Sequence, residues 1–123
     1  MNILVVDDSA AMRNMIIRTL RQAGFDGNEV TQAEDGAVAL AAVKQSLPDL
    51  VLADWNMPNM DGLSFVREIR RQGNTTPVIM VTTEAEKERV VEAIRSGVNN
   101  YVVKPFTPDA LSDRISETMA KAA

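Results

Sequence analysis

Five short apolar runs, rich in Val and Ile, alternate along the chain with segments in which apolar residues recur every three or four positions. The runs cover residues 3–6, 29–33, 50–53, 78–81 and 101–103. This alternation predicts β-α units that build a parallel sheet. The first, third and fourth runs are continuously apolar, which is typical of strands covered by helices on both faces. The second run contains Glu29, Thr31 and Gln32, so we expect it at an edge of the sheet.

The intervals between the runs carry helix signals. Met12, Ile16, Leu20 and Ala23 recur at helical spacing, and Gly24 suits a left-handed helix end, so a helix is predicted over residues 10–23. Capping residues, Gly and Pro mark the other helices. The second opens at Asp35-Gly36, the third opens at Asp61 or Gly62 and is followed by Gly73, the fourth runs from about Lys87 to Gly97, and the last begins at Thr107-Pro108 and ends near Met119.

Length and composition favour a single compact unit. The chain has 123 residues, of which 46% are hydrophobic and 24% are charged. A chain of this size folds as one domain and removes roughly two-thirds of its unfolded surface from water. No linker, repeat or low-complexity segment interrupts the five units. The sequence therefore predicts one α/β domain over residues 1–123, a doubly wound five-stranded parallel sheet with five helices and no output domain.

Composition also excludes several classes of function. The formal net charge of −4 opposes binding to nucleic acid phosphates. The chain has no Cys and no His, which excludes disulfides, thiolate catalysis and the usual zinc ligands. The N-terminal MNILVVDD is too short for a signal peptide, and no stretch reaches membrane-spanning length. We expect a cytoplasmic monomer with no nucleic acid partner and no membrane insertion, whose chemistry uses carboxylates, Lys and hydroxyls.

The polar residues that stand out lie where the predicted strands end. They are Asp7 and Asp8 after the first strand, Asp54 after the third, Thr82 at the end of the fourth, and Lys104, before Pro105, at the end of the fifth. Right-handed crossovers bring the carboxyl ends of parallel strands to one edge, where ligands of open α/β sheets bind. If the first and third strands are neighbours, three carboxylates converge there.

Three converging carboxylates need a compensating charge. Two carboxylates about 4 Å apart repel by about 4 kcal/mol at an effective dielectric constant near 20. A proton, a Lys or a metal ion relieves this repulsion. A site made of oxygen ligands favours a hard cation, and Mg²⁺ binds through one or two carboxylates while it keeps places for water and phosphate. The acids therefore predict a magnesium and phosphate site.

A simpler interpretation remains open for each residue alone. Asp8 or Ser9 could cap the first helix, and Asp54 could start a turn that ends at Asn56-Met57-Pro58. Lys104 alone would be a solvated surface residue and Thr82 a β-branched strand residue. The joint occurrence of the acids, the Lys and the Thr at one sheet edge favours a site over five separate structural roles.

Five segments carry a resemblance to a known family: LVVDDSAAMR, AEDG, ADWNMPNMDG, PVIMVTTEAEK and YVVKPFT. With these segments the chain resembles the receiver domain of bacterial two-component response regulators, and most closely the single-domain chemotaxis members of that family. The segments spread over essentially the whole chain. The resemblance implies a flavodoxin-like fold with strand order 2-1-3-4-5.

The resemblance also implies roles at the site. Asp54 would be the phosphoacceptor, which takes a phosphoryl group from the phosphohistidine of a histidine kinase. Asp7, Asp8, Asp54 and the backbone carbonyl of Asn56 would bind Mg²⁺, with Asp7 acting largely through a bound water. Lys104 would pair with the phosphoryl group, and the Lys104–Pro105 peptide bond would be cis.

Further residues would form the switch. Thr82 would turn its hydroxyl toward the phosphoryl oxygens, and Tyr101 would swing inward behind it. The alternative for Tyr101 is a half-buried strand aromatic with a wet hydroxyl. Thr83 lies where many receivers have a smaller residue, and Asn56 and Glu84 occupy positions that tune the phosphoryl lifetime. Trp55 could be only a packing residue, and Glu86 lies on the output face.

Three functions are compatible with these residues. In the first, a CheA-like histidine kinase phosphorylates a single-domain regulator, which binds a FliM-like flagellar motor switch protein through the face of the fourth helix, fifth strand and fifth helix. A phosphatase is a further candidate partner. In the second, the same chemistry serves a non-chemotaxis phosphorelay or stress pathway. In the third, the protein is a Mg²⁺-dependent phosphohydrolase, but the haloacid dehalogenase group carries its nucleophile in a DxD motif after the first strand, whereas Asp7 and Asp8 are adjacent here.

Overall fold

The computed structural model describes residues 1–25, 27, 29–83 and 87–122, and strands and helices alternate along these residues. The strands are β1 (Asn2–Val6), β2 (Glu29–Ala33), β3 (Leu50–Asp54), β4 (Val78–Thr82) and β5 (Asn100–Val103). The helices are α1 (Ala10–Leu20), α2 (Gly36–Gln45), α3 (Gly62–Arg71), α4 (Lys87–Arg95) and α5 (Pro108–Ala122). The five predicted β-α units are therefore confirmed.

The strands form one parallel sheet with the order β2-β1-β3-β4-β5, which confirms the expected order. The polar second strand lies at the edge, as predicted. In the register of the sheet, Val6 of β1 lies opposite Ala53 of β3, and Thr82 of β4 lies opposite Val103 of β5. The carboxyl ends of β1, β3, β4 and β5 consequently meet at one edge.

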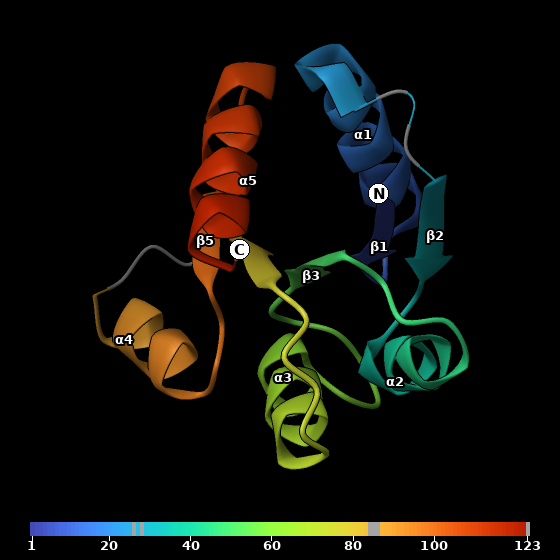
Figure 1. Ribbon diagram of the computed structural model, residues 1–123, viewed down its shortest axis with the longest axis vertical. Helices are drawn as coiled ribbons and strands as arrows, with labels where there is room; N and C mark the ends of the chain where they lie inside the picture. The colour runs from blue at the N-terminus through green and yellow to red at the C-terminus, as the bar shows by residue number, and fades with distance from the viewer. Residues whose placement is uncertain (26, 28, 84–86, 123) are drawn as a thin grey trace.

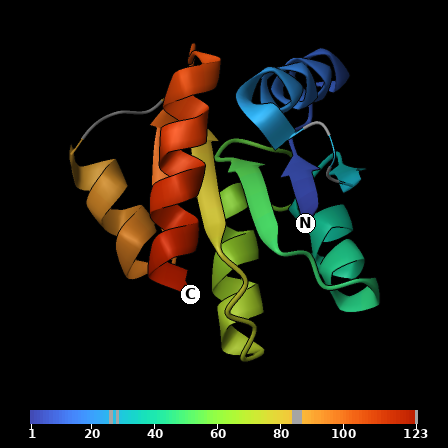
Figure 2. The ribbon, with the colours of Figure 1, turned by 45° about the horizontal axis from the view of Figure 1, so that its top comes forward.

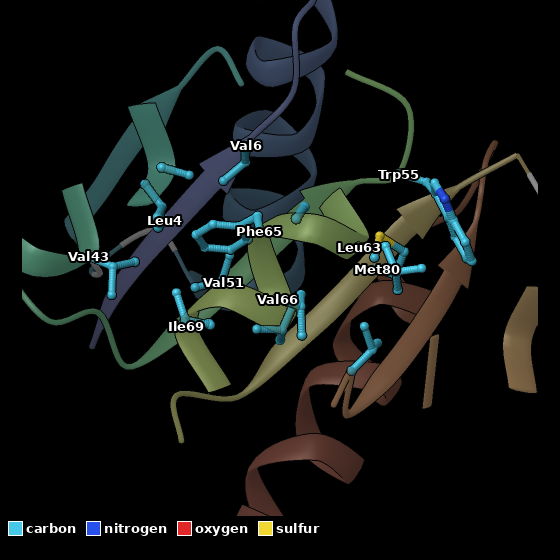
Figure 3. Packing of buried hydrophobic residues seen from close by; sticks show 14 of the residues in the cluster. Leu4, Val6, Val43, Val51, Trp55, Leu63, Phe65, Val66, Ile69 and Met80 are labelled. Carbon is cyan, nitrogen blue, oxygen red and sulfur yellow. The ribbon is translucent and has the colours of Figure 1, made fainter. Parts of the chain in front are cut away.

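The helices cover both faces of this sheet. Helices α1 and α5 lie on one face, and α2, α3 and α4 lie on the other (Figures 1 and 2). Alternate residues of a strand point to opposite faces, so Ile3 and Val5 pack in the cluster below α1 and α5, whereas Leu4 and Val6 pack toward α2 and α3. Figure 3 shows part of the cluster on the side of α2 and α3, which includes Phe65 of α3.

Capping residues explain where several helices begin. The side chains of Ser9, Asp35 and Asp61 accept hydrogen bonds from the amides of Met12, Val38 and Ser64 at distances of 3.2, 2.9 and 2.7 Å. Each bond satisfies a backbone donor that has no partner within its helix. The predicted starts, at Asp35-Gly36 and at Asp61 or Gly62, are therefore confirmed, with each Asp as the cap and each Gly as the first helical residue. Among the described residues, no helix combines the length and the apolar character needed to cross a membrane.

Two helix ends differ from the prediction. The first α-helix ends at Leu20 and not at residue 23, and the chain continues through a kinked turn, Arg21–Phe25. Gly24 in this turn has a φ of 98°, which confirms the left-handed backbone predicted there. The last helix continues to Ala122, beyond the predicted end near Met119. Apolar spacing alone does not report where the hydrogen bonds of an α-helix end, and the last turn of α5, residues 119–122, contains no Gly or Pro that would signal a stop.

Candidate functional site

The ends of β1 and β3 bring three carboxylates together. Asp7 and Asp8 follow Val6, and Asp54 ends β3, which is the neighbour of β1. One oxygen from each of the three carboxylates lies within 4.8 Å of the others. Asp7 is only 2% exposed, Asp54 is partly exposed and Asp8 is exposed. The three carboxylates thus converge at one edge, as predicted, and the structure adds that the cluster has a buried base and an open side.

Lys104, directly after β5, reaches this cluster from the other half of the sheet. Its Nζ lies 3.2 Å from Oδ2 of Asp7 and 3.4 Å from Oδ1 of Asp54. The Lys104 side chain is 13% exposed and the Asp54 side chain is 14% exposed, so solvent screens these charges less than it screens a surface pair. One ammonium group therefore offsets part of the repulsion between two carboxylates.

Backbone amides fix the orientation of the two inner carboxylates. The amide of Ser9 donates to Oδ1 of Asp7, and the amide of Trp55 donates to Oδ1 of Asp54, each at 2.9 Å. Ser9 also caps α1, so of the two capping candidates it is Ser9 that fills this role. The sequence does not predict the contribution of Arg13, whose Nη1 donates to the backbone carbonyl of Asp7 at 2.6 Å.

The surroundings of Asp54 make its negative charge unfavourable. Burial is the largest effect and raises the pKa of the Asp54 carboxyl above its ordinary value. The positive charge of Lys104 lowers this pKa, and the negative charge of Asp7 raises it again. A group that adds positive charge beside Asp54 would stabilise its ionised form.

The connection between β3 and α3 packs closely against Asp54. The amide of Gly62 donates to the carbonyl of Trp55 at 2.9 Å, which closes the loop over residues 55–62. A side chain at Gly62 would overlap the carbonyl oxygen of Asp54. Asn56 lies in this loop and is exposed. The loop therefore has fixed ends, and Asn56 lies in it two residues beyond Asp54.

The expected switch residues lie on β4 and β5. Thr82 is 2% exposed, and its carbonyl accepts a hydrogen bond from the amide of Lys104 at 2.8 Å. Thr83 follows and is exposed. The Lys104–Pro105 peptide bond is cis. Tyr101 is half-buried against the cluster that includes Met80, and the guanidinium of Arg114 lies 5.4 Å from its ring centre.

Three further residues named from the sequence do not belong to the carboxylate cluster in the structure as described. Glu84 and Glu86 lie outside the described residues. Trp55 is buried, as expected of a packing residue, but the guanidinium of Arg89 on α4 also lies 5.2 Å from its ring centre. This contact links α4 to the residue next to Asp54. Periodicity could not predict it, because the two residues are far apart in sequence.

The donor set at this edge fits a magnesium ion. Asp7, Asp8 and Asp54 supply carboxylate oxygens that converge on one point, and the cluster is open on the side of Asp8. Magnesium prefers oxygen ligands and retains several waters, which an open side accommodates. The buried negative charge, only partly offset by Lys104, is also what a divalent cation would neutralise.

Comparison with known proteins shows the family to which this fold belongs. Residues 3–116 match the response regulator receiver domain, so the chain belongs to this family. It is similar to the chemotaxis protein CheY-3 of Vibrio cholerae, with 41% identity over 119 residues that cover 95% of this chain and 90% of the relative. It is also similar to the chemotaxis protein CheY homolog of Campylobacter jejuni, with 43% identity over 122 residues that cover 97% and 92% of the two chains.

Solved structures give the same result. The structure of the chemotaxis protein CheY4 of Vibrio cholerae has a TM-score of 0.85 and 38% identity, and the match covers 95% of this chain and 97% of that one. The receiver domain of the Francisella response regulator 1452 has a TM-score of 0.85 at 30% identity, with 99% and 98% covered. Membership of this family favours a signalling switch over the phosphohydrolase considered from the sequence.

Proposed function

We propose that the chain is a single-domain, phosphorylation-dependent switch of a two-component pathway, with Asp54 as the phosphoacceptor. The observation that carries the proposal is the position of Asp54, at a sheet edge beside two further carboxylates and Lys104, with its Oδ1 held by the Trp55 amide. The curated relatives, of which the match covers 90% and 92%, support the single-domain form.

The transfer reaction uses the Asp54 carboxylate as nucleophile. One carboxylate oxygen attacks the phosphorus of a kinase phosphohistidine, an O–P bond forms and the P–N bond breaks. Asp54 becomes an acyl phosphate, and the released imidazole nitrogen takes up a proton. Among the described residues, the Trp55 amide and Lys104 both contact Oδ1, so we assign the attack to Oδ2.

The surrounding residues position and neutralise charge. Asp7, Asp8, Asp54 and the Asn56 carbonyl are the proposed ligands of Mg²⁺, which when bound would offset the negative charge of phosphate and carboxylates. Lys104 is close enough to Asp54 to pair with a phosphoryl oxygen on it. Phosphoryl transfer depends mostly on such positioning and charge stabilisation.

The switch residues would transmit the change to a partner surface. Thr82, whose backbone bonds to Lys104, would turn its hydroxyl toward the new phosphoryl oxygens, with Thr83 at the mouth of the site. Tyr101 would move inward behind Thr82, away from Arg114. This movement would bias a pre-existing equilibrium of the surface formed by α4, β5 and α5. Asn56 and Glu84 are the proposed residues that tune the phosphoryl lifetime.

The proposed output is chemotaxis in the cytoplasm. The curated relatives at 41% and 43% identity are chemotaxis proteins, which supports a CheA-like histidine kinase as donor and a FliM-like flagellar motor switch protein as target. A single-domain receiver in another phosphorelay or stress pathway is the second candidate, since the site chemistry is the same in both.

Phosphorylation can be tested with a small donor. In acetyl phosphate and Mg²⁺ the protein should gain one phosphoryl group by intact mass, and Asp54→Asn should not. Asp49→Asn is the matched control, because Asp49 is exposed and bonds to the Asn2 amide. Labelling of Asp54→Asn at the normal rate would remove Asp54 from the role of acceptor.

The output can be tested separately from the chemistry. A peptide from the N-terminus of a flagellar switch protein should bind more tightly when beryllofluoride occupies the site as a phosphoryl mimic. Absence of binding in both states, with a Trp55 fluorescence change that reports the mimic in the site, would assign the protein to another pathway.

A further inference from the structure

The loop that carries Asn56 is tied to the start of α2 by a pair of side chains. Asp35 is 5% exposed, and its Oδ1 accepts from the amide of Val38 as the cap of α2. Its second oxygen, Oδ2, accepts from the amide Nδ2 of Asn59 at 2.8 Å. One carboxylate therefore binds two elements that are 24 residues apart in sequence.

A backbone hydrogen bond also joins the start of α2 to this loop, next to the bond between Asp35 and Asn59. The amide of Gly36 donates to the carbonyl of Met60 at 2.9 Å. A Cβ atom at Gly36 would lie 2.5 Å from that oxygen, so the two segments approach as closely as glycine allows. Asn59 itself has a φ of 66°, in the left-handed region that Asn tolerates better than most residues. The conformation at Asn59 and Met60 is thus fixed from the side of α2.

The other end of the loop is fixed from the side of β3. The amide of Gly62 donates to the carbonyl of Trp55, and Trp55 donates to Asp54. Between Trp55 and Asn59 only Asn56, Met57 and Pro58 remain. The proline ring restricts φ at residue 58 and disfavours helical backbone at residue 57. Few conformations connect two fixed ends through three such residues.

We propose that Asp35 and Asn59 are positioning residues, which hold the backbone carbonyl of Asn56 in place for Mg²⁺ through their side-chain hydrogen bond. The inference rests on the proposed function, because it concerns the metal ligand assigned there. Neither side chain is itself assigned as a ligand. Groups that orient metal ligands typically change metal affinity by about tenfold or more when they are removed.

The test is a Mg²⁺ titration of the intact protein, followed by Trp55 fluorescence in the absence of any phosphoryl donor. Asn59→Gly removes the amide, keeps a residue that tolerates positive φ and leaves the net charge unchanged. Asp35→Ser keeps the helix cap but is too short to reach Asn59. Each variant should weaken Mg²⁺ binding by roughly tenfold. Because both changes remove the same hydrogen bond, the Mg²⁺ affinity of the double variant should be no lower than that of the more affected single variant.

A swapped pair distinguishes positioning from general damage. The swapped variant combines Asp35→Asn with Asn59→Asp. The amide oxygen at position 35 can still accept from the backbone amide of Val38. The amide nitrogen at position 35 can donate to the carboxylate at position 59, which reverses the direction of the bond. The bond and the net charge are therefore both kept. This variant should restore wild-type Mg²⁺ affinity. Ile69→Val, a buried change in α3 away from the loop, controls for loss of stability and should leave the affinity unchanged.

Hydrogen exchange supplies a second readout on metal-free protein. The amides of residues 56, 57, 59 and 60 should exchange faster in Asn59→Gly than in wild type, while the amides of β1 and β4 should not change. Wild-type Mg²⁺ affinity in Asn59→Gly and Asp35→Ser would overturn the inference and leave the proposed function intact. Failure of the wild-type protein itself to bind Mg²⁺ would instead contradict the metal site, and with it both proposals.

Discussion

At the scale of single residues, the charge on Asp54 opposes folding in the absence of a metal. Burial and the neighbouring Asp7 raise the pKa of the Asp54 carboxyl, and Lys104 opposes this only in part. The folded protein consequently binds a proton at Asp54 more tightly than the unfolded chain does. Stability is therefore expected to fall as the pH rises from about the ordinary value of 3.8 through the raised pKa of Asp54.

Asp54→Asn should stabilise the metal-free protein, because it removes this buried charge. We expect a gain of about 1 kcal/mol in the free energy of unfolding at pH 7 with a chelator present. The gain should shrink as the pH is lowered through the raised pKa of Asp54, because the native carboxyl then takes up its proton. Urea unfolding at several pH values measures this, and a gain that is the same at every pH would contradict the assigned cause.

Gly62 is a residue at which steric contact with the backbone leaves no room for a side chain. A Cβ atom there would overlap the Asp54 carbonyl oxygen, so Gly62→Ala should displace the β3-α3 loop and destabilise the protein by about 2 to 3 kcal/mol. Gly27→Ala is the control, because nothing lies within 4 Å of a Cβ atom at that position. Thermal unfolding of the two variants should differ clearly, and equal melting temperatures would refute the steric argument.

The sequence predicts the site residues that follow strand ends and misses those that support them. Asp7, Asp8 and Asp54 could be placed together because strand topology alone brings them to one edge. Asp35 was recognised only as the start of a helix, since its bond to Asn59 depends on how the loop at residues 55–62 packs against α2. Such tertiary contacts leave no periodic signal in the chain.

At the scale of elements, α3 is fastened to the segment before β5 by Arg70. Its guanidinium donates to the carbonyl of Gly97 through Nε and Nη2, at 3.1 and 2.9 Å, and to the carbonyl of Asn74 and the side chain of Asn99. Asn99 in turn accepts from the amide of Val78 at the start of β4. One partly buried side chain thus joins α3 to the starts of two strands.

Arg70→Lys should therefore be destabilising although it keeps the positive charge. A lysine cannot reproduce the fork that contacts three acceptors, and we expect a loss of about 2 kcal/mol. Arg71→Lys is the matched control, since Arg71 pairs with Glu68 on its own helix and is exposed. Denaturant unfolding should show a loss for the first variant and no change for the second. A similar loss in both would assign the effect to helix propensity.

The kind and order of elements were easier to predict than their ends. Runs of β-branched residues and helical spacing identify each element because burial imposes these periods. The end of α1 was placed three residues too late, since Ala23 continues the apolar spacing into the kinked turn Arg21–Phe25. Helix ends depend on local backbone hydrogen bonds, which apolar spacing does not report.

At the scale of the whole molecule, the sheet is most protected at its centre. Strand β1 lies between β2 and β3, and β3 and β4 are also paired on both sides. Each residue of β4 is buried, whereas β2 is exposed at most positions. The strand order itself was taken from the resemblance, because five similar β-α units are compatible with several orders.

Amide hydrogen exchange should follow this arrangement. The amides of β1, β3 and β4 should exchange most slowly, at rates set by global unfolding, and those of the edge strand β2 should exchange through local opening. Exchange followed by NMR at several denaturant concentrations separates the two regimes. Slowest exchange in β2 would contradict the burial pattern of the sheet.

The residues of the candidate site all lie where the strands end, so the opposite edge of the sheet, where the strands begin, can be altered without touching them. The connection from α2 to β3 turns at this opposite edge, and Leu47 on it is 66% exposed. Two residues hold this loop at its ends. The amide of Ser46 donates to the carbonyl of Ala42 in α2, and Asp49 bonds to Asn2 of β1 through both its backbone amide and its side-chain carboxylate. A peptide tag or a second domain inserted at Leu47 would therefore lie at the edge of the sheet opposite Asp54, so a protein attached to a surface through Leu47 should keep the carboxylate cluster facing solution.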